Sequence, residues 1–201
     1  MAAQIDYYLS LNSPWTYLGA ARFEAIVTRH GATVAVMPVD FGQIFAQSGG
    51  LPLAKRAPQR QAYRLVELAR WRDHLGLPLT LKPKYFPAHE NLAARLVVAT
   101  REAGVDALGL AHAILRALWA EERNTGDPAT LDEIARARGL EAAALFNAAE
   151  SEAIKARYQA DTARAMAANV FGAPSYVLDG EIFWGQDRLD FLGRALSKRA
   201  G

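Results

Sequence analysis

The chain of 201 residues contains no cysteine. This absence excludes disulfide bonds, thiol nucleophiles and thiolate metal sites. The 4 histidines are scattered without the spacing of a metal-binding motif, so no metal site is expected. No apolar run approaches the roughly 20 residues of a membrane span, and the N-terminus lacks the basic and apolar regions of a secretory signal. We therefore expect a cytoplasmic protein with no membrane partner.

Neither sign of charge is in large excess. With 23 Lys and Arg against 21 Asp and Glu, the formal net charge is only +2. This small excess gives little support for nucleic-acid binding, which normally requires a clustered basic face. The basic stretch 55–72 also contains Tyr63 and Trp71, but Glu67 and the helical spacing favour a solvated amphipathic face over RNA contact. With 51% hydrophobic residues, the chain can build one core, as one domain or one domain with an insertion.

Residues 13–16 read Ser-Pro-Trp-Thr, directly after a short strand pattern and at the start of a helical one. Ser13 suits the N-cap, where its Oγ lies among unpaired N–H groups at the positive end of the helix dipole, and Pro14 suits the first helical position. Thioredoxin-like proteins carry Cys-x-x-Cys at such a turn, and here both sulfur positions are hydroxyls. The turn cannot exchange disulfides, yet it can hold an anion, including a thiolate supplied by another molecule. The simpler interpretation is a serine that only starts a helix.

Residues 170–185 have the pattern of a β-hairpin. Alternating apolar residues flank Asp179 and Gly180, a pair typical of a type I′ turn. Pro174 falls at the start of the first strand, where its missing N–H is tolerated. In thioredoxin-like folds a cis-proline at this place lies across from the Cys-x-x-Cys turn. The sequence leaves the isomer of the bond before Pro174 open.

The order of patterns is β-α-β, then a long helical middle, then β-β-α. Gly31 and Gly76 are expected to end two helices, and Thr130 to open another with a capping box. This order predicts an α/β, thioredoxin-like sheet with a large all-helical insertion between its second and third strands. We assign 1–39 and 168–201 to the thioredoxin-like domain and 40–167 to the insertion domain. Strands are predicted at 5–9 and 33–39, and helices at 14–29, 151–167 and 187–198 among others.

Two terminal motifs resemble those of one family. Residues 6–19 look like the opening of the 2-hydroxychromene-2-carboxylate isomerases, which are grouped with the kappa-class glutathione transferases and the DsbA-like oxidoreductases. Residues 170–174 and 183–189 are similar to the closing motif of that family. Residues 48–52 and 60–78 also have family-like spacing, so the resemblance covers essentially the whole chain.

The resemblance implies glutathione as the cofactor. Its sulfur would lie beside Ser13, and Ala173, the residue before Pro174, would pair with its cysteinyl main chain as an added strand does. Asp187 would accept from the α-ammonium of the γ-glutamyl group, or it is only the N-cap of the last helix. Gln186 either binds the same group or is an ordinary exposed loop residue. The segment implied to meet the γ-glutamyl group is Trp184, Gly185, Gln186 and Asp187.

The chain departs from the family in the loop after the second strand. Relatives carry a lysine and an asparagine there, whereas this chain has Ala46 and Gly50, so one expected anchor is absent. Lys55 and Arg56, nearby, either supply a cation for a carboxylate of glutathione or substrate, or are solvated loop residues. His89 replaces a second asparagine, and either faces the substrate as a donor or lies on the surface at a helix start.

The function implied by the resemblance is a glutathione-dependent cis-trans isomerase acting on an aromatic, conjugated keto-acid. A thiolate stabilised by Ser13 would add reversibly to the conjugated double bond, which divides one hard isomerisation into easier steps. Two alternatives remain: a kappa-class-like glutathione transferase using the same thiolate, and a non-catalytic thioredoxin-like binding module. The partners expected are the aromatic substrate, glutathione and, as in relatives, a second copy in a homodimer, with no nucleic acid.

Overall fold

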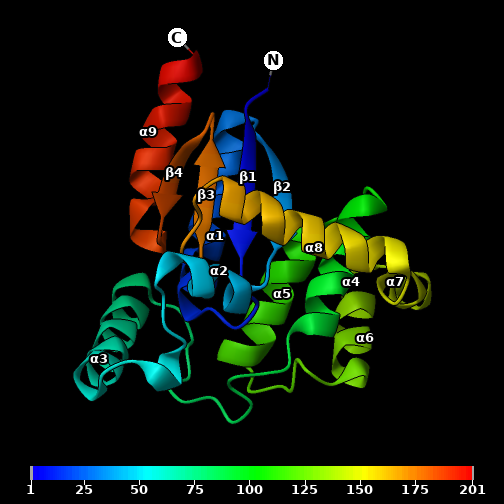
Figure 1. The fold of residues 1–201 in the computed structure, drawn as a ribbon, viewed down its shortest axis with the longest axis horizontal. Helices are drawn as coiled ribbons and strands as arrows, with labels where there is room; N and C mark the ends of the chain where they lie inside the picture. Colours follow the sequence, from blue (N-terminus) through cyan, green and yellow to red (C-terminus); the bar gives the residue numbers. More distant parts are fainter. Residues whose placement is uncertain (1, 201) are drawn as a thin grey trace.

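A computed structural model describes residues 2–200 of the chain. The sheet within them has the order β2-β1-β3-β4, and consists of β1 (Gln4–Leu9), β2 (Thr33–Pro38), β3 (Ser175–Leu178) and β4 (Glu181–Trp184). β1 and β2 are parallel, while β3 is antiparallel to β1 and to β4. The two ends of the chain therefore share one sheet (Figure 1), and the predicted β-α-β and β-β-α halves are confirmed.

Side chains alternate between the two faces of this sheet. Tyr7 and Tyr176 belong to the large core cluster on one face, whereas their neighbours Tyr8 and Val177 belong to a smaller cluster on the other. Successive residues of a strand point to opposite faces, so a sheet covered on both sides needs apolar residues at nearly every position. This explains why Tyr7, Tyr8 and Leu9, three successive residues of β1, are all apolar and buried.

The helices cover both faces and extend the molecule at one end of the sheet. In Figure 1, α2 and α8 lie in front of the sheet and α1 behind it. α1 contributes to the larger cluster and α2 to the smaller one, whereas α8 contributes to both. Seven helices separate β2 from β3 in the chain, which confirms the predicted helical insertion. The helices are α1 (Pro14–His30), α2 (Phe41–Ser48), α3 (Pro58–Leu75), α4 (Asn91–Glu102), α5 (Ala107–Trp119), α6 (Pro128–Ala137), α7 (Ala142–Ala149), α8 (Glu152–Ala167) and α9 (Leu189–Ala200).

Helix ends follow capping chemistry, but the predicted start of α6 is wrong. Gly31 and Gly76 end α1 and α3 in the left-handed conformation, as expected. Thr130 does not open α6. The helix begins two residues earlier at Pro128, and the Asp127 side chain accepts from the N–H of Ala129. An Asp–Pro pair combines a strong N-cap with the residue best suited to the first helical position, and it prevails over the capping-box pattern.

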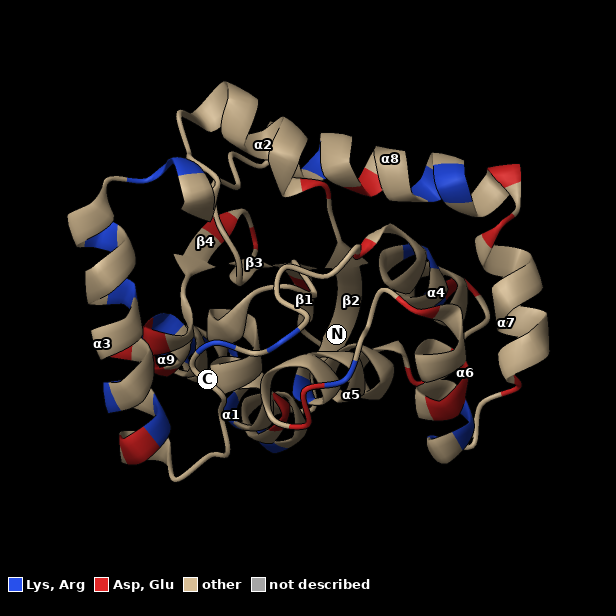
Figure 2. Cartoon of the chain, turned by 90° about the horizontal axis from the view of Figure 1, so that it is seen from below, with Lys and Arg blue, Asp and Glu red and all other residues tan. Residues whose placement is uncertain are grey.

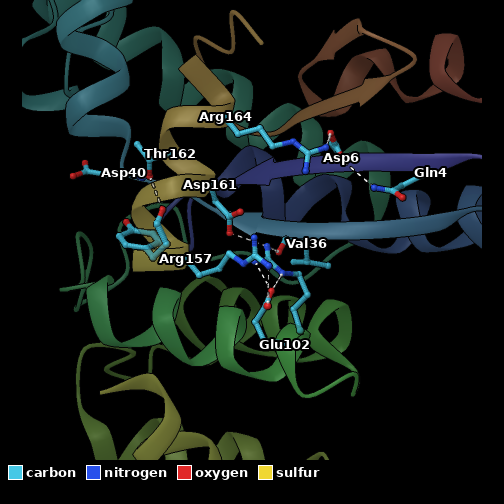
Figure 3. Close-up of polar contacts among 11 residues, drawn as sticks. Gln4, Asp6, Val36, Asp40, Glu102, Arg157, Asp161, Thr162 and Arg164 are labelled. Atoms are coloured by element: carbon cyan, nitrogen blue, oxygen red, sulfur yellow. Dashed lines mark hydrogen bonds and ion pairs between the residues drawn. The ribbon is translucent and has the colours of Figure 1, made fainter. Parts of the chain in front are cut away.

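Polar contacts attach α8 to the sheet and to α4 (Figure 3). Arg164 of α8 pairs with Asp6 of β1. Asp161 of α8 pairs with Arg101 of α4 at 2.8 Å, and Arg101 also donates to the carbonyl of Val36 in β2 at 2.9 Å. Burial raises the pKa of Asp161, although the charge of Arg101 opposes the shift. Such a buried pair fixes the position of a helix more than it stabilises the fold.

The most buried helix of the insertion is α5, in which Leu110, Ile114 and Trp119 are 0% exposed. It has 13 residues, too few for the roughly 20 that a membrane span requires. Within residues 2–200, no helix has both the length and the apolar character to cross a bilayer.

Candidate functional site

Ser13 is the N-cap of α1, with extended backbone dihedrals of φ −82° and ψ 117°. Its Oγ accepts from the N–H of Thr16 at 3.2 Å, so the hydroxyl lies among the first N–H groups of a 17-residue helix. Of the two hydroxyls that replace the thiols of Cys-x-x-Cys, Thr16 is 0% exposed and Ser13 is 9% exposed. Ser13 is therefore the hydroxyl that a ligand can reach.

The segment before β3 meets Ser13 from the other end of the chain. The Ser13 hydroxyl donates to the carbonyl of Ala173 at 3.4 Å, and the Ala173–Pro174 peptide bond is cis. The carbonyl of Pro174 accepts from the N–H of Gly185 at 2.9 Å, which brings the residues after β4 to the same place. Two motifs 160 residues apart in the sequence are thus in contact.

Gly172 is required because Trp184 packs against it. A Cβ on Gly172 would lie 2.3 Å from the indole Nε1 of Trp184, closer than real Cβ contacts. The Trp184 ring also packs against Phe171, with centroids 4.8 Å apart, and remains 50% exposed. A large apolar surface therefore flanks the Ala173 backbone and remains accessible to a ligand.

The insertion holds the turn that precedes Ser13. The carboxylate of Glu90 accepts from the Ser10 hydroxyl at 2.9 and 3.0 Å and from the N–H of Asn12 at 3.1 Å. The Asn12 side chain donates to the carbonyl of Ala88 and accepts from its N–H, each at 2.9 Å. Burial raises the pKa of Glu90, against the effect of these donors. No local sequence pattern indicates this clamp, because its halves lie 76 to 80 residues apart.

A cavity of about 560 Å³ opens beside the Ser13–Ala173 contact, large enough for a drug-sized ligand. Ala173, Trp184 and the 3-10 turn Gln186–Arg188 form one wall, and α3 forms the facing wall. Figure 2 shows Lys and Arg distributed along α3. On this side, Arg60 and Arg64 of α3 and Arg56, just before the helix, line the cavity.

The cavity gathers some predicted site residues and leaves others outside. Ala173 and the segment from Trp184 to Asp187 line it, and Ser13 adjoins it through Ala173. Three predicted substrate-side residues, Gly50, Lys55 and His89, are not among the residues that line it. A Cβ on Gly50 would lie 2.3 Å from the Phe45 ring, so no asparagine fits at this position unless Phe45 moves.

Gln186 is not an exposed loop residue, and Asp187 is not the N-cap of the last helix. Gln186 is 2% exposed rather than a solvated loop residue, and Arg22 donates to its backbone carbonyl at 3.0 Å and to its side-chain oxygen. Asp187 lies within a 3-10 turn rather than at the N-cap of α9, which begins at Leu189. The Asp187 carboxylate is exposed to the cavity and pairs with Arg188 at 2.7 Å.

Comparison with known proteins places the chain in a family. Residues 4–197 match the family described as the DSBA-like thioredoxin domain. The chain is 28% identical over 193 residues to a 2-hydroxychromene-2-carboxylate isomerase of Sphingobium xenophagum, covering 96% of this chain and 97% of that protein. It is 29% identical over 83 residues to glutathione S-transferase kappa 1 of Caenorhabditis elegans, covering 41% of this chain and 36% of that protein.

A solved 2-hydroxychromene-2-carboxylate isomerase has the same fold. The two superpose with a TM-score of 0.80 at 26% identity, covering 98% of this chain and 96% of the other. These findings confirm the relationship that the terminal motifs indicated. The chain belongs to the DSBA-like thioredoxin domain family.

Proposed function

We propose that this protein is a glutathione-dependent isomerase of aromatic keto-acids of the 2-hydroxychromene-2-carboxylate type. The observation that carries the proposal is the contact between the Ser13 hydroxyl and the carbonyl of Ala173, a residue that lines a large cavity. The near full-length relationship to proteins named as these isomerases supports the reaction. The partial match to a kappa glutathione transferase supports the thiol.

The residues around the cavity suit glutathione, which carries two carboxylates and one ammonium group. Arg56 and Arg60 offer cations for the carboxylates, and Asp187 offers an acceptor for the ammonium. The exposed Trp184 gives apolar contact to the chain between them. Because the protein has no cysteine, any thiol chemistry in this site must use sulfur from outside the chain.

When bound, glutathione supplies a thiolate that adds reversibly to the conjugated double bond, allows rotation about the resulting single bond and is then expelled, so that nothing is oxidised overall. The role of Ser13 is to donate its hydroxyl to an anionic sulfur at the positive end of α1. The partial charge of the helix terminus favours the same ionised form. Ala173 offers the backbone that positions an extended peptide beside this hydroxyl.

An assay that follows two substrates tests the proposal. Isomerisation of a 2-hydroxychromene-2-carboxylate is monitored by ultraviolet absorbance with and without glutathione, beside conjugation of chlorodinitrobenzene. We expect turnover that requires glutathione and leaves its concentration unchanged. Consumption of glutathione with a conjugated product would instead identify a transferase. Absence of glutathione binding in calorimetry would overturn both the isomerase and the transferase assignments and would favour a non-catalytic binding module.

A further inference from the structure

The wall of the cavity that faces Ala173 contains a cation with no anionic partner. Arg64 of α3 is partly buried, and its guanidinium lies over the rings of Phe86, at 5.3 Å, and Trp119, at 5.7 Å. Within residues 2–200 the Arg64 side chain has no ion pair and no hydrogen bond. Its N–H donors are therefore free for a ligand in the cavity.

The other charges on the cavity do not neutralise Arg64. Of the two carboxylates on its lining, Glu67 pairs with Arg70 at 2.6 Å and Asp187 pairs with Arg188 at 2.7 Å. The Arg56 guanidinium, whose charge acts on Arg64, has the same sign. This wall of the cavity therefore has an excess of positive charge.

The surroundings of Arg64 favour a ligand that brings a negative charge. Burial, and secondarily the charge of Arg56, lower the pKa of Arg64 to about 10. A partly buried charge without a partner is unfavourable, and contact with aromatic faces offsets only part of the cost. A carboxylate in the cavity offsets the remaining free-energy cost of this unpaired charge, because a guanidinium can bind both carboxylate oxygens at once.

We propose that Arg64 is the receptor for the carboxylate of the aromatic acid substrate and thereby sets the specificity of the site for anionic substrates. This assignment rests on the proposed function. The aromatic acid, rather than the thiol peptide, is favoured because Arg64 lies in an aromatic environment of Phe86 and Trp119, and because Trp15 and Trp71 line the same cavity. The main chain of a thiol peptide is expected on the opposite wall, at Ala173.

Binding of a matched pair of ligands tests the assignment. The probes are benzylidenepyruvate, which carries the carboxylate, and its methyl ester, which has the same ring system without the charge. Affinities are measured by tryptophan fluorescence and calorimetry for the unchanged protein, Arg64→Gln, Arg64→Lys and Arg72→Gln. Arg72 is the matched control, because it lies on the same helix, pairs with Asp73 and does not line the cavity.

We expect Arg64→Gln to weaken binding of the acid by about 10- to 100-fold and of the ester by less than about threefold. Arg64→Lys should restore part of the affinity, since it keeps the charge and loses the planar fork. Arg72→Gln should change neither affinity. The midpoint temperature of thermal unfolding should not be lower for Arg64→Gln than for the unchanged protein, because the substitution removes an unpaired charge.

Equal losses for acid and ester would overturn the assignment, because they would show that Arg64 only shapes the cavity. A loss confined to glutathione affinity would also overturn it, since Arg64 would then bind the thiol. A different outcome would overturn the proposed function while leaving the assignment of Arg64 intact. If the unchanged protein binds the acid through Arg64 and does not bind glutathione, the receptor stands and the thiol-dependent reaction is wrong.

Discussion

At the scale of single residues, Ser13 combines a structural and a chemical role. Its Oγ accepts from the Thr16 N–H as an N-cap, and its hydroxyl proton points to the Ala173 carbonyl. A ligand sulfur that replaces this carbonyl as acceptor would leave the cap intact. The two roles can therefore be separated by comparing Ser13 with another capping serine.

We predict that Ser13→Ala lowers kcat by about 100-fold while the Kd for glutathione rises less than about threefold, because the hydroxyl matters most where negative charge develops. Loss of the cap should also cost about 1 kcal/mol of stability. Ser151→Ala is the control, since Ser151 caps α8 by accepting from the Ile154 N–H at 3.3 Å. It should lose similar stability without losing activity. Equal losses of kcat and of glutathione affinity in Ser13→Ala would contradict the prediction.

The residues that were hard to predict owe their roles to distant partners. Ser13 and Pro174 stand out locally, because each has a distinctive position at the start of an element. Gln186 does not, since its burial depends on Arg22, 164 residues earlier. Arg64 was assigned to a solvated face together with its basic stretch but is partly buried, because helical spacing shows which residues share a face and not what covers it.

At the scale of elements, the loop before α4 and the turn before α1 behave as one unit. Glu90 accepts from Ser10 and Asn12, and it is the only carboxylate that the structure places on this turn within the described residues. An isosteric amide at this position would present N–H donors to the donors of the turn. The turn would then lose the contacts that position Ser13.

We predict that Glu90→Gln lowers the free energy of unfolding by about 1 to 3 kcal/mol and lowers kcat more than it raises KM. Urea unfolding and steady-state kinetics measure the two effects. Glu133→Gln is the control, because Glu133 is exposed and pairs with Arg123 across the surface. An active Glu90→Gln of unchanged stability would show that the clamp is not needed.

The pairing of α1 with α5 gives a pH dependence. Glu24 of α1 accepts from Nδ1 of His112 in α5, and this hydrogen bond lowers the pKa of Glu24 from its ordinary value. A carboxyl whose pKa is lower in the folded state stabilises the fold above its unfolded pKa. That contribution is lost as the pH falls through the folded value.

We therefore predict that Glu24→Gln is less stable than the unchanged protein near neutral pH, by less than about 1 kcal/mol because Glu24 is half exposed. The two stability curves should converge between about pH 5 and pH 3. Urea midpoints measured across this range check the prediction. Curves that stay parallel to low pH would exclude a contribution from this carboxylate.

Element ends show where local chemistry is sufficient. Gly31 and Gly76 ended their helices as predicted, because glycine adopts the left-handed conformation without a steric penalty. The start of α6 was predicted wrongly at Thr130, since two capping patterns compete within four residues and Asp127–Pro128 is the stronger. The start of α9 was predicted two residues early, because a 3-10 turn precedes it.

At the scale of the whole molecule, one apolar core joins the sheet to the insertion. A single cluster contains Ile5 of β1, Ile114 of α5, Leu131 of α6 and Leu145 of α7. The division at residues 39 and 168 is therefore a division of topology, and the core continues across it. The sequence predicted the order of the elements and could not show this continuity.

We predict a single cooperative unfolding transition, because neither part has a core of its own. Far-ultraviolet circular dichroism reports mostly on the helices of the insertion. In a variant with Trp71 and Trp119 of the insertion replaced by phenylalanine, fluorescence of Trp15 and Trp184 reports on the thioredoxin-like part. The two signals should give the same urea midpoint. Separate midpoints would establish the predicted insertion domain as an independent folding unit.

The paired hydrogen bonds between Asn12 and Ala88 also constrain how this scaffold can be recombined with its relatives. A chimera that imports residues 86–90 from another member inherits a backbone adapted to a different partner at position 12. Segments 10–16 and 86–90 therefore have to be transplanted together.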